Sequence, residues 1–182
     1  PGFLETLRTL TEKSRTLLIL DETHTLSSGP GGYARAHGIV PDGLVFGKPI
    51  AGGIPAAAYG FSQPVADRIA TYLATKGEGR SGIGTTLSGS RIQLALIKTV
   101  LTEYFTEEAF APLLVLARRL ERGIADVIIK YGMPWHVTRV GARVEFMCTP
   151  KPPRNGFEAS QVIHQPVDVA VHHYLLNRGV VI

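Results

Sequence analysis

Cysteine is almost absent from this chain of 182 residues: Cys148 is the only one, so no disulfide can form within the chain. A single cysteine fits a reducing compartment. The opening stretch PGFLETLRTL is charged and amphipathic and does not read as a secretory signal. No apolar run reaches the roughly 20 residues of a membrane-spanning helix. We therefore expect a cytoplasmic protein that does not enter a membrane.

Charge is also sparse. Charged residues make up 19% of the chain and apolar residues 45%, which is a globular composition. The formal net charge of +4 comes from scattered basic residues, and the chain has neither the concentrated basic patch nor the motif typical of nucleic-acid binding. His172 and His173 would point about 100° apart on a helix, which suits no shared ion. We expect no nucleic acid partner and no metal.

Hydrophobic periodicity predicts alternating helices and strands as far as Tyr131. The pattern after Gly132 changes to alternating strand-like residues, so we place a domain boundary there and expect domains at 1–131 and 132–182. The expected helices are 2–14, 64–73, 92–104, 107–131 and 167–177. The expected strands are 16–20, 44–46 and 57–61, further strands within 135–148, and one that begins at Gly179.

An acid ends the first expected strand. In LLILDETHT, the apolar run that leads to Leu20 reads as a short strand buried on both faces, and Asp21 follows it. Ligands of open α/β sheets bind outside such strand ends. A partly desolvated carboxylate there requires a positive partner, which a protonated cofactor ring nitrogen would supply. A loop-pinning aspartate is the alternative. Glu22 beside it could support the site or have a structural role.

A lysine follows the second strand. In LVFGKPIAGGIP, Lys48 lies between the strand and Pro49. Proximity to a core would lower the pKa of such a lysine and leave a neutral amine that can form a Schiff base with an aldehyde. A surface lysine on a loop is the alternative.

Together, the two residues suggest one cofactor. Pyridoxal phosphate needs a carboxylate to keep its ring nitrogen protonated and an amine to hold its aldehyde carbon. Its phosphate needs backbone N–H groups and hydroxyls, which GTTLSGS at residues 84–90 supplies just before a helix.

Three stretches, LLILDETHT, GGYARAHGIVPDGLVFGKPIAGGIPAAAYG and GTTLSGS, resemble the class III aminotransferases. These are fold-type I pyridoxal-phosphate enzymes, and the group includes glutamate-1-semialdehyde aminomutase. The resemblance implies an α/β fold, with the C-terminal part of the cofactor-binding large domain in residues 1–131: a mostly parallel sheet with helices on both faces. Part of a smaller α+β C-terminal domain would follow in residues 132–182. Family members are much longer, so we expect this chain to be a piece of a longer protein.

The resemblance also assigns the catalytic and ring-binding residues. Asp21 matches the aspartate that pairs with the pyridine nitrogen. Lys48 matches the lysine that holds the cofactor aldehyde and then shuttles a proton. Thr23 stands where the family usually has Val or Ile on the ring face. His24 stands where Gln, Met or His lies near the ring hydroxyl.

A further pair of residues implies a homodimer. Thr86 matches a threonine that binds the cofactor phosphate of the neighbouring subunit, and Thr85 would add a backbone contact. The active sites would then be built across the subunit interface.

The resemblance implies an aminotransferase that moves an amino group from an amino acid or amine donor to a keto or aldehyde acceptor. The alternatives are a 2,1-aminomutase of the glutamate-1-semialdehyde type, which moves the amino group within one molecule, and a non-catalytic binding domain of the same fold. The loop at 26–28 has Leu-Ser-Ser where many relatives have an aromatic residue and an arginine, so no substrate contact is assigned there.

Overall fold

The computed structural model describes residues 2–77, 84, 88–163 and 165–181, and the chain forms two compact units, 1–114 and 115–182. The first unit begins with helix α1, and β1 follows it. Its described elements are α1 (Phe3–Ser14), β1 (Ile19–Asp21), the 3₁₀ turn η1 (Thr25–Ser28), α2 (Gly32–Ala36), β2 (Gly43–Gly47), the 3₁₀ turn η2 (Lys48–Ala51), β3 (Ala57–Phe61), α3 (Gln63–Ala74), α4 (Arg91–Thr99) and the π-helical turn η3 (Val100–Tyr104).

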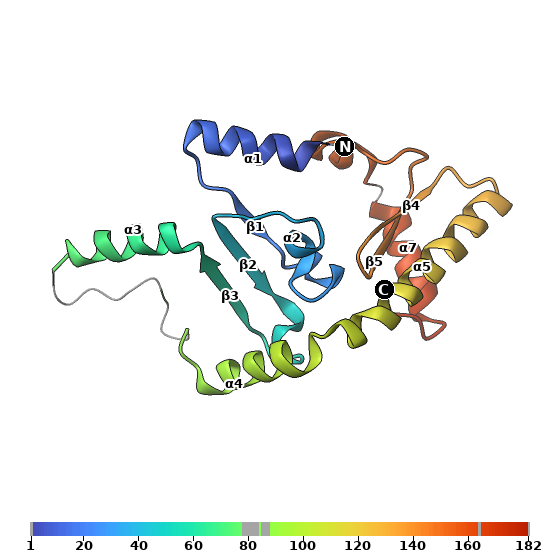
Figure 1. Ribbon diagram of the computed structural model, residues 1–182. Helices are drawn as coiled ribbons and strands as arrows, with labels where there is room; N and C mark the ends of the chain where they lie inside the picture. Colours follow the sequence, from blue (N-terminus) through green and yellow to red (C-terminus); the bar gives the residue numbers. More distant parts are fainter. Residues whose placement is uncertain (1, 78–83, 85–87, 164, 182) are drawn as a thin grey trace. The chain divides into compact units, whose positions relative to one another are not determined.

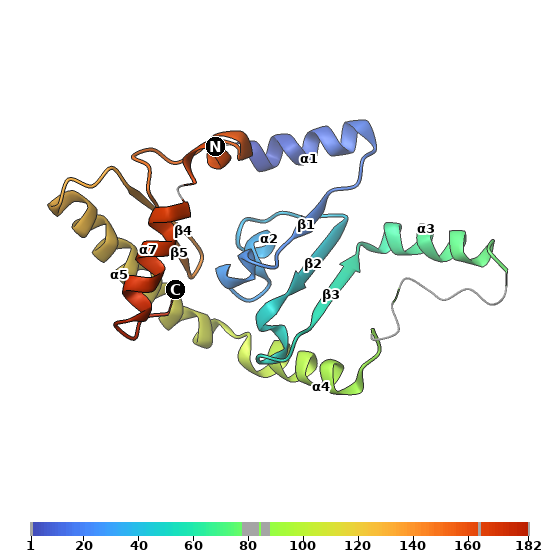
Figure 2. The ribbon, with the colours of Figure 1, turned by 180° about the vertical axis from the view of Figure 1, so that it is seen from behind.

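The strands of the first unit form one sheet in the order β1-β2-β3, as Figures 1 and 2 show from opposite sides. Strands β1 and β2 are parallel, whereas β2 and β3 are antiparallel. The described sheet is therefore mixed rather than mostly parallel. The reason is the connection: only residues 52–56 separate η2 from β3, and a parallel crossover needs a dozen or more residues.

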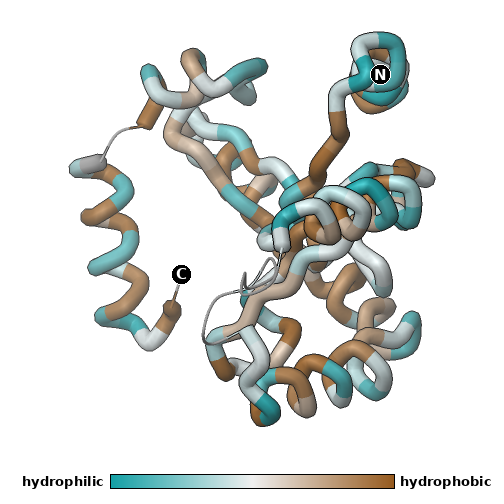
Figure 3. The backbone as a smooth tube through the Cα atoms, turned by 90° about the vertical axis from the view of Figure 1, so that its left-hand side faces the viewer, coloured by the Kyte–Doolittle hydropathy of each residue, from teal (hydrophilic) through white to brown (hydrophobic). Residues whose placement is uncertain are grey.

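The first strand is shorter and less buried than the sequence predicts. It begins at Ile19 rather than Thr16, and although Leu18 is buried, the Ile19 side chain is 52% exposed. Strand β1 lies at the edge of the described sheet, so no described strand pairs with it on that side. Hydrophobic segments recur along the helices as well as the strands in Figure 3, and many of their large side chains are exposed.

The Asp42 carboxylate, which we call the Asp42 clamp, lies at the starts of the two parallel strands. One oxygen of Asp42, Oδ2, accepts hydrogen bonds from Leu18 N and from Arg8 Nη1, each at 2.8 Å. The backbone N of Asp42 donates to Leu18 O at 2.8 Å. The clamp therefore ties α1 to the starts of β1 and β2.

The second unit contains most of α5 (Glu107–Lys130), then β4 (His136–Val140), β5 (Arg143–Met147), α6 (Gly156–Val162) and α7 (Gln165–Leu176). The predicted strands of this region form the antiparallel pair β4–β5, and Trp135 stacks on Phe146 with ring centroids 5.6 Å apart. One expectation fails: no strand begins at Gly179, because residues 177–179 form a turn and Val180 and Val181 are irregular. In addition, the sequence pattern did not predict helix α6.

The two compact units divide inside α5, and the domain boundary expected near Gly132 stays a prediction. No helix in the described part of the chain has the length and apolar character needed to cross a membrane. Among these residues, no group of three or more His, Cys, Asp or Glu side chains is arranged to hold a metal ion.

Candidate active site

Asp21 and Lys48 lie at the same edge of the sheet. Asp21 is the last residue of β1 and pairs with Val45 of β2, and Lys48 comes three residues after Val45. Because β1 and β2 are parallel, their carboxyl ends point in the same direction. The two predicted residues are thus brought to neighbouring strand ends, where ligands of α/β sheets bind.

The Asp21 carboxylate is exposed and is oriented by Thr23. Its Oδ1 accepts a hydrogen bond from Thr23 N at 2.9 Å and a second, short one from the Thr23 hydroxyl. Among the described residues, no hydrogen bond reaches Oδ2 of Asp21, which leaves that oxygen able to accept one.

These contacts lower the pKa of Asp21 below its ordinary value of 3.8. The hydrogen bond from the Thr23 hydroxyl has the largest effect, followed by the bond from Thr23 N, and the positive charges of His24 and Lys48 lower the pKa further. Lys48 is therefore close enough to Asp21 for its charge to act on the carboxylate.

Lys48 has an unusual backbone conformation, and the residues that follow it are buried. Its φ is +56°, in the left-handed region that residues other than glycine seldom adopt. Two and three residues further along η2, Ile50 and Ala51 are almost fully buried, and α4 packs against the turn. The expected burial of Lys48 itself is not met, because the described chain leaves its side chain exposed.

Sequence reasoning left the role of Glu22 undecided, and the structure gives it a structural one. The Glu22 side chain is 1% exposed, and its carboxylate accepts hydrogen bonds from Tyr33 N and Ala34 N, each at 2.6 Å. The Thr25 hydroxyl donates to the same carboxylate at 3.1 Å. Glu22 therefore holds the start of α2 against the end of β1.

The bond between Thr23 and Asp21 was not predicted from the sequence, although an Asp side chain that accepts from the backbone N two residues later forms a common local turn. His24 lies exposed beside the site, at the start of η1. Thr85 and Thr86 lie outside the described residues, so their expected phosphate contacts stay predictions.

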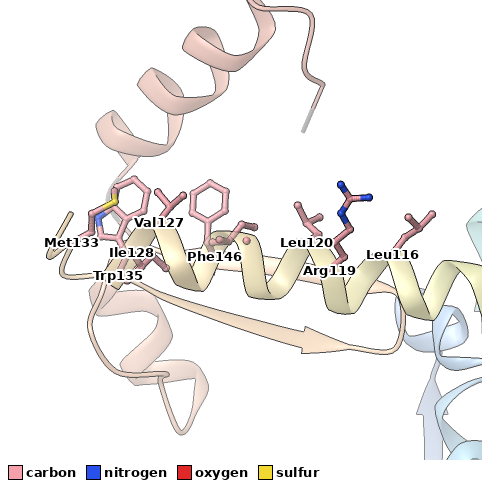
Figure 4. Close-up of a pocket in the computed structure, with 10 residues that line it drawn as sticks. Leu116, Arg119, Leu120, Val127, Ile128, Met133, Trp135 and Phe146 are labelled. Carbon is pink, nitrogen blue, oxygen red and sulfur yellow. The ribbon is translucent and has the colours of Figure 1, made fainter. Parts of the chain in front are cut away.

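The second unit has a pocket of a different kind. Its volume is about 490 Å³, and Figure 4 shows side chains from α5 directed into it. Apart from Arg119 its lining is apolar or glycine, and it contains none of the predicted site residues: Leu116, Arg119, Leu120, Gly123, Ile124, Val127, Ile128, Met133, Trp135 and Phe146. It has no acid, amine or thiol for catalysis.

Comparison with known proteins gives consistent matches. The family model described as Aminotransferase class-III matches residues 1–182. "Glutamate-1-semialdehyde 2,1-aminomutase 2" from Brevibacillus brevis is 37% identical over 183 residues, which is 100% of this chain and 41% of that protein. This chain therefore spans less than half the length of that relative.

Solved structures match over the whole of this chain as well. A glutamate-1-semialdehyde aminomutase from Pseudomonas aeruginosa, in complex with PMP, has a TM-score of 0.92 and 44% identity, and the match covers 41% of that chain. An omega-transaminase from Sphaerobacter thermophilus has a TM-score of 0.83 and 28% identity, again with 41% of that chain covered. These matches confirm the expected fold-type I α/β architecture, and the chain belongs to the class III aminotransferase family.

Proposed function

We propose that this chain is the part of a pyridoxal-phosphate enzyme that carries its catalytic lysine and aspartate, and that the full-length enzyme is a 2,1-aminomutase. The observation that supports the proposal most is the placement of Asp21 and Lys48 at adjacent ends of parallel strands.

Pyridoxal phosphate is the cofactor of the family, and the residues present fit it. The fit rests on a carboxylate with one oxygen able to accept a hydrogen bond and an amine at the same sheet edge. When bound, the cofactor supplies an aldehyde to which amines attach and a ring that takes up electrons from the substrate.

Each residue of this chain then has a defined task. Oδ2 of Asp21 would accept a hydrogen bond from the ring nitrogen, and its negative charge would hold a proton there. The Lys48 amine would hold the cofactor and, once released, would take a proton from the substrate carbon that bears nitrogen and return it to another carbon as a general base and acid. The Thr23 hydroxyl would keep Asp21 ionised and oriented.

The aminomutase is preferred to the aminotransferase because the more similar relatives are named aminomutases. The relative at 37% identity and the structure at 44% identity both have that name, whereas the omega-transaminase is 28% identical. The aminotransferase expected from the sequence is the second candidate, since the same two residues serve both reactions.

One substrate experiment separates the two reactions. The full-length protein, loaded with cofactor, is given glutamate 1-semialdehyde and no keto acid. An aminomutase should convert it to the isomer with the amino group moved from carbon 2 to carbon 1. If conversion occurs only when a separate amino donor and keto acceptor are added, the aminotransferase is the correct assignment.

A second experiment tests the lysine. Borohydride reduction of the cofactor-loaded protein should fix the cofactor to Lys48, and mass spectrometry of the digest should find it on the peptide that contains Lys48. Lys48→Ala should abolish the labelling, and Lys98→Ala, which removes an exposed lysine of α4, should not. Labelling of Lys48→Ala to the level of the unmodified protein would rule out the lysine assignment, and failure of the unmodified protein to take up cofactor would favour the non-catalytic alternative.

The predicted assembly also remains a proposal. A homodimer with shared active sites follows from the expected role of Thr86. A cytoplasmic location is proposed as well, and the single cysteine fits it. Sedimentation of the full-length protein, with and without cofactor, tests the dimer.

A further inference from the structure

Glu22 is a buried acid that the proposed reaction does not use. Its neighbour Asp21 is exposed, whereas the Glu22 side chain is 1% exposed and is enclosed by the described residues alone. Glu22 directly follows the last residue of β1, and its carboxylate is hydrogen-bonded to η1 and α2, whereas Asp21 is exposed.

The two backbone hydrogen bonds of the Glu22 carboxylate are ones that only an acceptor can make. Oε2 accepts from Tyr33 N and the Thr25 hydroxyl, and Oε1 accepts from Ala34 N. The donors belong to η1 and to α2, so both segments are held to the residue that follows Asp21. A glutamine would bring an NH₂ group against one of these donors.

The backbone of Glu22 is fixed at the same point. Its N donates to Val45 O at 2.7 Å, which extends the contact between β1 and β2 one residue beyond Asp21, and its O accepts from Leu26 N at 3.0 Å. Glycine at position 32 is part of the arrangement: its φ is +70°, and a Cβ there would lie 2.3 Å from Oε2 of Glu22.

From this geometry we infer that Glu22 is a positioning residue for Asp21. Within the described residues, the hydrogen bonds of the Asp21 side chain come from Thr23, two residues further along, so its direction depends on the backbone between them. Glu22 fixes that backbone to β2, η1 and α2. The inference rests on the proposed function, because its consequence is a carboxylate directed at the cofactor ring nitrogen.

The test uses the full-length protein and two variants that weaken the same contacts. Glu22→Gln keeps the size of the side chain and replaces one acceptor oxygen by a donor. Thr25→Val removes only the hydroxyl donor and is the milder change. Asp42→Asn is the matched control, because Asp42 also accepts a backbone N–H but lies at the opposite ends of β1 and β2.

The measurements are the affinity of the cofactor-free protein for pyridoxal phosphate, by absorbance titration, and the Tm. Glu22→Gln should weaken the affinity for pyridoxal phosphate about tenfold, which is the effect expected when the ring nitrogen loses its hydrogen bond to the charged Asp21 carboxylate. Thr25→Val should weaken this affinity about threefold. Thr25→Ser should restore it. Asp42→Asn should lower the Tm while the affinity stays within about twofold of the unmodified value.

If Glu22→Gln and Thr25→Val both lower the Tm but bind pyridoxal phosphate as tightly as Asp42→Asn does, Glu22 has a purely structural role and the inference is wrong. If Glu22→Gln does not fold, Thr25→Val and its serine counterpart decide the question. An unmodified protein that binds no pyridoxal phosphate would instead overturn the proposed function, and the inference with it.

Discussion

At the scale of single residues, the Thr23 hydroxyl makes a specific contribution to Asp21. It is the largest cause of the lowered pKa of that carboxyl group. Thr23→Val should therefore raise the pKa of Asp21 toward its ordinary value of 3.8, although the bond from the backbone N of residue 23 remains. Thr23→Ser should keep the low pKa. Titration of the Asp21 carboxyl carbon by NMR measures both, and an unchanged pKa in Thr23→Val would contradict the assignment.

The backbone of Lys48 gives a second residue-scale prediction. A left-handed φ costs an L-residue other than glycine about 1 kcal/mol, and Lys48 has a φ of +56°. Lys48→Gly and Lys48→Ala both remove the amine, but only glycine adopts this φ without strain. Lys48→Gly should therefore be the more stable of the two by about 1 kcal/mol, partly offset by the greater freedom of glycine in the unfolded chain. Thermal unfolding compares them, and a higher Tm for Lys48→Ala would show that the turn is not strained.

At the scale of elements, the Asp42 clamp should make stability depend on pH. The bond from Leu18 N, and then the bond from Arg8, lower the pKa of Asp42 in the folded chain. A carboxyl group whose pKa is lower when folded stabilises the protein above its unfolded pKa, and this stabilisation is lost as the pH falls through the folded pKa. Asp42→Asn should cost about 1–2 kcal/mol at neutral pH, and this cost should shrink as the pH falls below 3.8, the ordinary pKa of the group.

The Tm measured against pH for Asp42→Asn and for the unmodified protein checks this. Glu12→Gln is the control, because Glu12 also pairs with Arg8 but is 63% exposed, and exposed pairs contribute little. Equal effects of the two substitutions at neutral pH would contradict the clamp.

The helices were the elements that the sequence predicted best. Helix α1 was expected at 2–14 and is Phe3–Ser14, and α5 was expected at 107–131 and is Glu107–Lys130. Apolar spacing repeats over several turns in both, so the signal is strong. Helix α6 was missed because it has only seven residues and follows a proline-rich stretch; its clearest signal is Asn155, whose side chain accepts a hydrogen bond from Glu158 N.

The site was predictable in part. Asp21 and Lys48 follow apolar runs, and the parallel pairing of two short strands brings them to one edge. The contacts of Glu22 were not predictable, because they reach Tyr33 and Ala34, 11 and 12 residues further along the chain. Only the path of the loop between β1 and α2 determines that these donors meet one carboxylate.

At the scale of the whole molecule, the chain spans 41% of the Brevibacillus brevis relative and 41% of the Pseudomonas aeruginosa structure, and it exposes large apolar side chains in both units. Ile92 is 71% exposed in the first unit, and Ile129 and Phe157 are 78% and 76% exposed in the second. Burial of one such side chain contributes about 1.5–3 kcal/mol, and large exposed apolar patches are typical of interaction surfaces. These surfaces are suited to contact further polypeptide.

A polypeptide of these 182 residues alone should therefore bind a hydrophobic dye strongly and associate as its concentration rises. Dye fluorescence and sedimentation velocity over a range of concentrations measure the two effects. Replacing Ile92 and Ile129 by threonine should reduce both, since each change removes exposed apolar surface, whereas the matched change of Lys98 and Lys130 to glutamine should not. A chain that stays monomeric and binds no dye would mean that these side chains are covered within the 182 residues, and that more of the fold is complete in this chain than its exposed faces indicate.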